Sequence, residues 1–98
     1  MNTTDSVSSV AATLAQRQNV HGDFSDNSLA TQRCMDALML CPSWHEMSPS
    51  AKTATFLIIQ KLSRAASGNP WHSDHWHDIQ GYAKLVEDRL SPPVPPTK

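Results

Sequence analysis

The chain has 98 residues, of which 39% are hydrophobic, and its 8 Lys and Arg nearly balance its 9 Asp and Glu for a net charge of -1. This length fits one small domain, and the balanced charge argues against a basic nucleic-acid binder or an acidic tail protein. A chain this short buries only about 60 to 65% of its unfolded surface, so we expect a helical homodimer that shares a core.

The N-terminal part of the chain predicts two helices. Apolar residues recur at helical spacing over residues 6–18, after a stretch, 1–5, that we expect to be flexible. A break at residues 19–23 separates this helix from a second one, which begins between residues 24 and 27 and ends at Pro42. The candidate N-caps of the second helix are Ser25, Asp26 and Asn27.

The second predicted helix is apolar around most of its circumference. Cys34 and Cys41 lie two turns apart, too far to form a disulfide within the helix, and are expected to be reduced, buried thiols of an intracellular protein. Such an apolar helix suits a dimer contact. The stripe that we expect to face the core consists of Ala30, Cys34, Ala37, Leu38 and Cys41.

The second half of the chain predicts two further helices. Ser48 followed by Pro49 is typical of a helix start, and the third helix is expected to end at Gly68. An Asn-Pro turn leads into a fourth helix over about residues 72–90.

These elements describe a single all-α domain over residues 6–90, a small bundle of about four helices. The tail, 91–98, contains four prolines and is expected to be extended and flexible. The longest purely apolar run covers only residues 37–41, so no signal peptide or membrane span is predicted and we expect a cytoplasmic protein.

The third and fourth predicted helices each place charged residues on one face. A step of about 100° per residue brings Lys61 and Arg64 together on the third helix, and Asp74 and Asp78 beside Tyr82 on the fourth. Helices joined by a short turn usually pack antiparallel, so the two cations should face the two carboxylates. Carboxylates suit Mg²⁺ and the cations suit phosphate, although plain cross-helix salt bridges would explain the same spacing.

Two further segments carry candidate ligands. His72, His75 and Asp78 follow one another at one-turn spacing, which could present them to a transition metal, while packed or solvated histidines are the more common explanation. His21 and Asp23 lie in the break between the first two helices and could orient each other, although ordinary turn chemistry also explains this segment.

Together these segments resemble a family of small phage and prophage proteins of poorly defined function. The family pattern is an Arg, a His-Gly-Asp-Phe turn, a Lys-x-x-Arg helix and Asp-His-Trp-x-Asp-Ile-x-Gly-Tyr, and the match spans about residues 14–90. In this chain the pattern falls on Arg17, on residues 21–24, on Lys61 and Arg64, and on residues 74–82. Through this family the chain is more remotely similar to the MazG-like all-α pyrophosphohydrolases, which hydrolyse nucleoside triphosphates with magnesium.

The resemblance implies a dimeric MazG-like bundle with a nucleotide pocket between its helices. Where the enzymes carry an acidic pair on the third helix, this chain has Thr53 and Phe56. Three functions therefore stay open: a Mg²⁺-dependent triphosphate hydrolase of the host-cell cytoplasm, a module that binds or sequesters a nucleotide, and a phage interaction protein that inhibits a host defence protein. The implied roles are Mg²⁺ ligation for Asp74 and Asp78, nucleotide contact for Lys61, Arg64 and Tyr82, and catalysis for His21 and Asp23.

Overall fold

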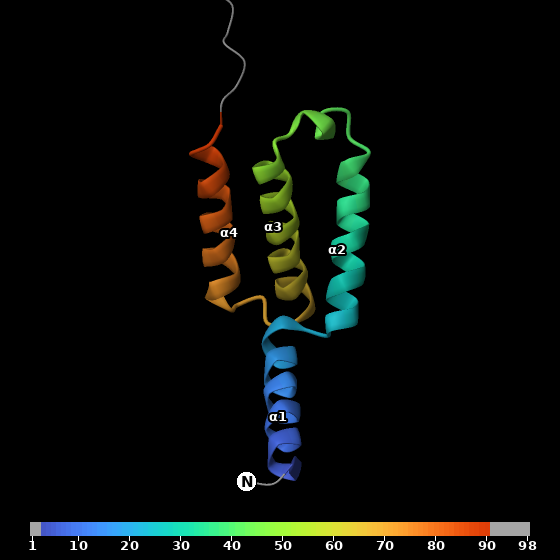
Figure 1. Cartoon of the computed structure of the whole chain (residues 1–98), viewed down its shortest axis with the longest axis vertical. Helices are drawn as coiled ribbons and strands as arrows, with labels where there is room; N and C mark the ends of the chain where they lie inside the picture. The colour runs from blue at the N-terminus through green and yellow to red at the C-terminus, as the bar shows by residue number, and fades with distance from the viewer. Residues whose placement is uncertain (1–2, 91–98) are drawn as a thin grey trace, which may run out of the picture.

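A computed structural model describes residues 3–90, which form four α-helices and one short 3-10 helix. No strand occurs within these residues, so the predicted all-α class is confirmed (Figure 1). No helix in this part of the chain is long and apolar enough to cross a membrane. The predicted flexible tail, 91–98, lies outside the described residues. The elements are α1 (Thr3–His21), α2 (Phe24–Met39), η1 (Trp44–Glu46), α3 (Pro49–Ser67) and α4 (Ser73–Glu87).

The central helix is α3, which packs against α2 on one side and α4 on the other (Figure 1). The two flanking helices do not pack against each other to any comparable extent. α1 contacts α3 and projects away from the end of the other helices (Figure 1). The helices α2, α3 and α4 therefore form a single layer, and both flat faces of this layer are open.

The predicted ends of the third helix are confirmed. Ser48 is the N-cap of α3, and its Oγ accepts a hydrogen bond from the Ala51 backbone N–H at 3.1 Å. Pro49 is the first helical residue, where its missing N–H costs nothing, and Gly68 is the C-cap. The fourth helix begins one residue later and ends three residues earlier than the predicted range of 72–90.

The break between the first two helices is shorter than predicted. α1 continues to His21 instead of ending at residue 18, and only Gly22 and Asp23 separate it from α2. The N-cap of α2 is Asp23, whose Oδ2 accepts a hydrogen bond from the Asp26 N–H at 3.1 Å, so the three N-caps predicted from the sequence are wrong. Gly22 has a φ of 81°, and this left-handed conformation reverses the chain in two residues.

The buried side of α2 also differs from the prediction. Asn27 and Thr31 are buried, and the Thr31 hydroxyl donates a hydrogen bond to Ser63 Oγ on α3 at 3.2 Å. Cys34 and Cys41 are exposed, so the prediction of buried thiols is wrong for the single chain. The reason is that α2 has one helical neighbour and meets it through small polar side chains, which leaves the apolar stripe beside the contact.

Few apolar side chains are buried within the described part of the chain. The four that are buried are Ala51, Ala54, Ile59 and Ala65. Three of these are alanines, and large side chains such as Leu29 and Leu62 are 51% and 41% exposed. A helical domain normally buries its apolar stripes between two packed layers, so the single layer of this chain leaves much of its apolar surface in contact with water.

Two glycines allow α1 to lie against the end of α3. A Cβ atom added at Gly68 would overlap the Val20 carbonyl oxygen, and one added at Gly22 would lie 2.5 Å from Ser67 Cβ. The Asn69 N–H donates a hydrogen bond to the Val20 carbonyl at 2.9 Å. The turn after α1 and the turn after α3 are therefore joined backbone to backbone.

We expect Gly22→Ala and Gly68→Ala each to lower the free energy of unfolding by about 1–3 kcal/mol, because the new methyl group must displace backbone or adopt a strained φ. Gly81→Ala is the matched control: nothing lies within 4 Å of its added Cβ, and alanine in the α4 interior should stabilise by about 0.5–1 kcal/mol. Urea unfolding followed by circular dichroism measures all three. A Gly68→Ala variant as stable as the unmodified protein would contradict this contact.

Candidate functional site

The turn between α1 and α2 lines a hollow of about 460 Å³, closed on one side by the C-terminal part of α3. We call it the Arg64 hollow. Its volume is within the range of small-molecule sites. The polar and aromatic side chains that line it are Arg17, Gln18, His21, Asp23, Phe24, Asn27 and Arg64.

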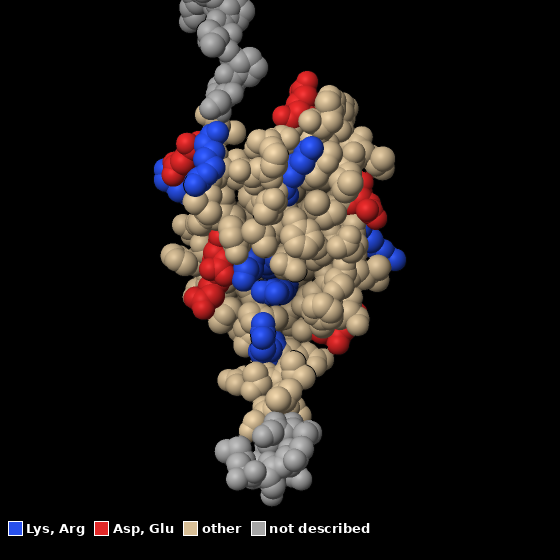
Figure 2. All heavy atoms as spheres, in the orientation of Figure 1, with Lys and Arg blue, Asp and Glu red and all other residues tan. Residues whose placement is uncertain are grey.

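The Arg64 hollow carries two positive charges without acidic partners. Neither Arg17 nor Arg64 forms an ion pair with a carboxylate among the described side chains. The carboxylate in the hollow, Asp23, is engaged by the N–H of Asp26. Figure 2 shows basic side chains gathered near the centre of this face, over α3, with acidic side chains towards α4. The hollow is therefore suited to an anion.

Asn27 holds the start of α2 against the end of α1. Its Nδ2 donates a hydrogen bond to the His21 carbonyl at 2.7 Å, and the residue is 8% exposed. Its Oδ1 and the Nδ1 of His21 are buried without a hydrogen-bond partner. Phe24, three residues before Asn27, also lines the hollow and is 81% exposed. The buried side of the hollow is thus polar and held in place by the hydrogen bond of Asn27, whereas the aromatic ring of Phe24 is exposed to solvent.

Three histidines pack behind the hollow. The ring centroids of His21, His72 and His75 are 4.9–5.9 Å apart, all in edge-to-face arrangements. His75 is 1% exposed, and its Nε2 lies 3.4 Å from the Val20 carbonyl oxygen. No three His, Cys, Asp or Glu side chains of the described residues are placed to hold a metal ion, so the predicted His72, His75 and Asp78 set is not assembled as a transition-metal site.

The pKa values of His21 and His75 both lie below the ordinary value of a histidine. Burial lowers the pKa of His75, and its neighbour His72 and the nearby cations of Lys61 and Arg64 lower it further, although the Val20 carbonyl acts in the opposite direction. Burial likewise lowers the pKa of His21, together with the charge of Arg64. A lowered pKa favours the neutral imidazole, so the rings of His21 and His75 pack edge to face without mutual repulsion at pH 7.

We expect the melting temperature to fall as the pH drops from 7 to 5. Unfolded histidines bind protons below about pH 6.5, whereas His21 and His75 take up protons in the folded state only at lower pH, so acid favours the unfolded state. Thermal unfolding across this range measures the slope. His75→Gln should flatten the slope, whereas His77→Gln, at an exposed position, should leave it unchanged. An equal slope in His75→Gln and the unmodified protein would contradict this assignment.

The predicted meeting of charges between α3 and α4 is confirmed for one pair. Lys61 Nζ lies 2.8 Å from Asp78 Oδ2, with the two side chains 16% and 40% exposed. The hydrogen bond from Lys61 lowers the pKa of Asp78. Arg64 faces the hollow instead, and the exposed Asp74 lies 3.6 Å from His72 Nε2. Lys61, Arg64, Asp74 and Asp78 therefore do not meet at one site. Lys61 pairs with Asp78, Arg64 lines the hollow, and Asp74 lies beside His72.

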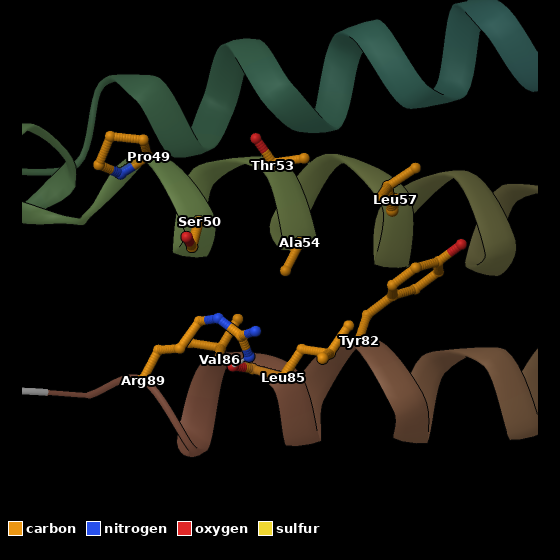
Figure 3. A pocket seen from close by; sticks show the side chains of 9 residues that line it. All are labelled: Pro49, Ser50, Thr53, Ala54, Leu57, Tyr82, Leu85, Val86 and Arg89. Atoms are coloured by element: carbon orange, nitrogen blue, oxygen red, sulfur yellow. Dashed lines mark hydrogen bonds between the residues drawn. The ribbon is translucent and has the colours of Figure 1, made fainter.

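Tyr82 lies in a different depression, a groove of about 410 Å³ between α3 and α4 (Figure 3). Figure 3 shows its ring extending from α4 towards α3, near Leu57. Thr53, one of the two positions that would carry a carboxylate in the MazG-like enzymes, is exposed at this groove, and Phe56 is half-buried. The predicted site residues therefore occupy the hollow, the Lys61–Asp78 pair, the start of α4 and this groove.

The roles of Arg17, Phe24 and Asn27 in the hollow were missed from the sequence. Arg17 and Phe24 belong to the family pattern, so their positions carried a signal. Asn27 carried none, because its partner is the backbone carbonyl of His21, and only the tight turn at Gly22 brings the two together.

Comparison with known proteins finds no matching family model, no matching curated protein and no matching solved structure. The resemblance to phage proteins and to MazG-like enzymes therefore stays a prediction from the sequence motifs. Function has to be inferred from the chemistry of the hollow.

Proposed function

We propose that the protein is a MazG-like nucleotide-binding protein that works as a homodimer and holds a nucleoside triphosphate in the Arg64 hollow. The observation that carries this proposal is the pair of guanidinium groups, Arg17 and Arg64, which line one hollow and have no ion-pair partner among the described side chains. Guanidinium groups bind phosphate oxygens through two parallel hydrogen bonds, so two of them suit a polyphosphate.

The rim of the hollow supports the same proposal. Phe24 is 81% exposed and offers its ring as a surface on which a base can stack. It is also the first residue of α2, so backbone N–H groups of the first turn are close by and add a weak preference for anions. A nucleotide joins a base to phosphates. An aromatic ring beside two arginines offers a contact for each of these parts.

Hydrolysis is the second part of the prediction and needs Mg²⁺. The carboxylates predicted to hold the ion are Asp74, which is exposed, and Asp78, which is paired with Lys61. The neutral imidazole of His21, in the hollow with Asp23, is of the type that accepts a proton from an attacking water. Two carboxylates are few for a catalytic Mg²⁺ site, so binding is the function proposed here and hydrolysis stays a prediction.

We expect nucleoside triphosphates to raise the melting temperature of the protein. A ligand at about 100 times its dissociation constant stabilises the folded state by roughly 2.7 kcal/mol. Arg64→Ala should remove most of this shift by removing a phosphate ligand. Arg89→Ala is the control, because this guanidinium lies in the α3–α4 groove and donates to the Leu85 carbonyl.

Ribo- and deoxyribonucleoside triphosphates should be compared in a thermal-shift assay, with and without Mg²⁺. If none of them shifts the melting temperature, nucleotide binding is wrong and the interaction with a host protein becomes the leading alternative. If Arg64→Ala and Arg89→Ala lower the shift equally, the ligand is not in the Arg64 hollow.

We expect Asp78→Asn to abolish the part of the nucleotide shift that depends on Mg²⁺, and any release of pyrophosphate, because it removes a predicted metal ligand. Asp88→Asn is the control: this carboxylate also pairs with a lysine, Lys84, at 2.6 Å, but lies at the far end of α4. A Mg²⁺-dependent shift that persists in Asp78→Asn would show that Asp78 only anchors Lys61.

A further inference from the structure

The start of α2 brings hydrogen-bond acceptors to the Arg64 hollow, beside the two guanidinium groups. Asp23 and Asn27 both line the hollow. Asp23 forms no ion pair with Arg17 or Arg64 among the described side chains. Donors therefore reach the hollow from α1 and α3, and oxygen acceptors reach it from α2 and its N-cap, so a ligand meets both kinds of group.

Asp23 is held in place by its role as the N-cap of α2. Its Oδ2 accepts a hydrogen bond from the Asp26 N–H at 3.1 Å, which orients the carboxylate. No hydrogen bond or ion pair among the described residues reaches its Oδ1. A carboxylate accepts about four hydrogen bonds and donates none, so Asp23 keeps free capacity on both oxygens for the N–H groups of a ligand.

Asn27 adds to the excess of acceptors at this end of the hollow. Its Nδ2 donates to the His21 carbonyl at 2.7 Å, which fixes the orientation of the side-chain amide. The remaining oxygen, Oδ1, is buried without a hydrogen-bond partner. Buried acceptors without a donor are rare in folded proteins because they cost stability. The side of the hollow that α2 provides is therefore short of donors.

The nucleobases differ in what their Watson–Crick edges offer to a carboxylate. Guanine presents two neighbouring donors, its N1–H and its N2 amino group. Adenine and cytosine each present an amino group beside a ring nitrogen that only accepts, and uracil presents one N–H between two carbonyl oxygens. A carboxylate can therefore receive two parallel hydrogen bonds from guanine, whereas every other base directs an acceptor at it.

The positions of the aromatic ring and the arginines suit a base next to Asp23. Phe24 follows Asp23 directly and its ring is 81% exposed, so a base stacked on the ring has its edge near the carboxylate. Arg17 lies one turn before His21, about 6 Å along α1, and Arg64 reaches the hollow from α3. The phosphate contacts are thus set apart from the base contacts, as a nucleotide requires, because its sugar lies between the two.

We propose that the base of the nucleotide in the Arg64 hollow is guanine, which Asp23 recognises through the N1–H and the N2 amino group. This inference rests on the proposed nucleotide function and adds the identity of the base to it. Asp23 is then a residue that determines specificity, in place of the catalytic role that the family resemblance implies for it.

Dissociation constants of the unmodified protein test this choice of base. Isothermal titration calorimetry with Mg²⁺ should show GTP binding about tenfold more tightly than ATP, CTP or UTP, because hydrogen bonds to a carboxylate are strong and the other bases leave it facing an acceptor. ITP retains the N1–H of guanine but lacks its N2 amino group, and should bind several-fold more weakly than GTP.

Asp23→Asn changes the recognition and keeps the helix cap, since asparagine is as good an N-cap as aspartate. The new side chain carries one oxygen and one NH₂ group. GTP should therefore lose its advantage over ATP, and XTP should gain affinity, because its C2 carbonyl oxygen accepts a hydrogen bond from the NH₂ group. Asp36→Asn is the matched control: Asp36 is exposed on α2 outside the hollow, and its replacement should leave the order of affinities unchanged.

Equal affinities for GTP and ATP, or for GTP and ITP, in the unmodified protein would overturn the choice of guanine and leave the nucleotide site standing. An Asp23→Asn variant that is folded by circular dichroism and still prefers GTP would also overturn it, since Asp23 would then be an N-cap alone. If none of these nucleotides binds, this inference and the proposed function are both wrong.

Discussion

The backbone carbonyl of Val20 is the point on which the arrangement of the helices depends. It accepts the N–H of Asn69, just after α3, and faces Nε2 of His75 in α4, while the next carbonyl, of His21, accepts the side-chain amide of Asn27 in α2. Elements distant in the sequence thus meet at the last turn of α1. The contact is possible because the chain carries glycine at Gly22 and Gly68, where a side chain would separate the two turns.

This junction also explains the position of the candidate site. A chain reversal within two residues places Phe24 and Asn27 directly beside the C-terminal end of α1, where His21 lies in the last turn and Arg17 one turn earlier. Arg64 reaches the same place from the last turn of α3. Burial and the surrounding cations lower the pKa of His21 and of His75, so the positive charge of the hollow at pH 7 comes from its arginines. Lys61, one turn earlier, is already neutralised by Asp78.

The single layer limits how much apolar surface the chain buries. With α3 packed on both edges and open on both faces, the chain buries mainly alanine, and its larger apolar side chains stay in contact with water. The Arg64 hollow opens on one of these faces, and its two arginines have no ion-pair partner among the described side chains.

The sequence by itself determined the elements and the contacts between neighbours in the chain. The Ser48–Pro49 start and the Gly68 end of α3 follow from local capping chemistry, and the Lys61–Asp78 pair follows from helical periodicity across a short turn. Tertiary structure alone decided which side of α2 is buried, because that depends on how many neighbours the helix has. It also decided that His21 meets His72 and His75, and that Arg17 joins Arg64 around one hollow. These contacts join residues about 50 positions apart, and neither propensity nor periodicity carries information over that distance, whereas the backbone approach of two glycines fixes it.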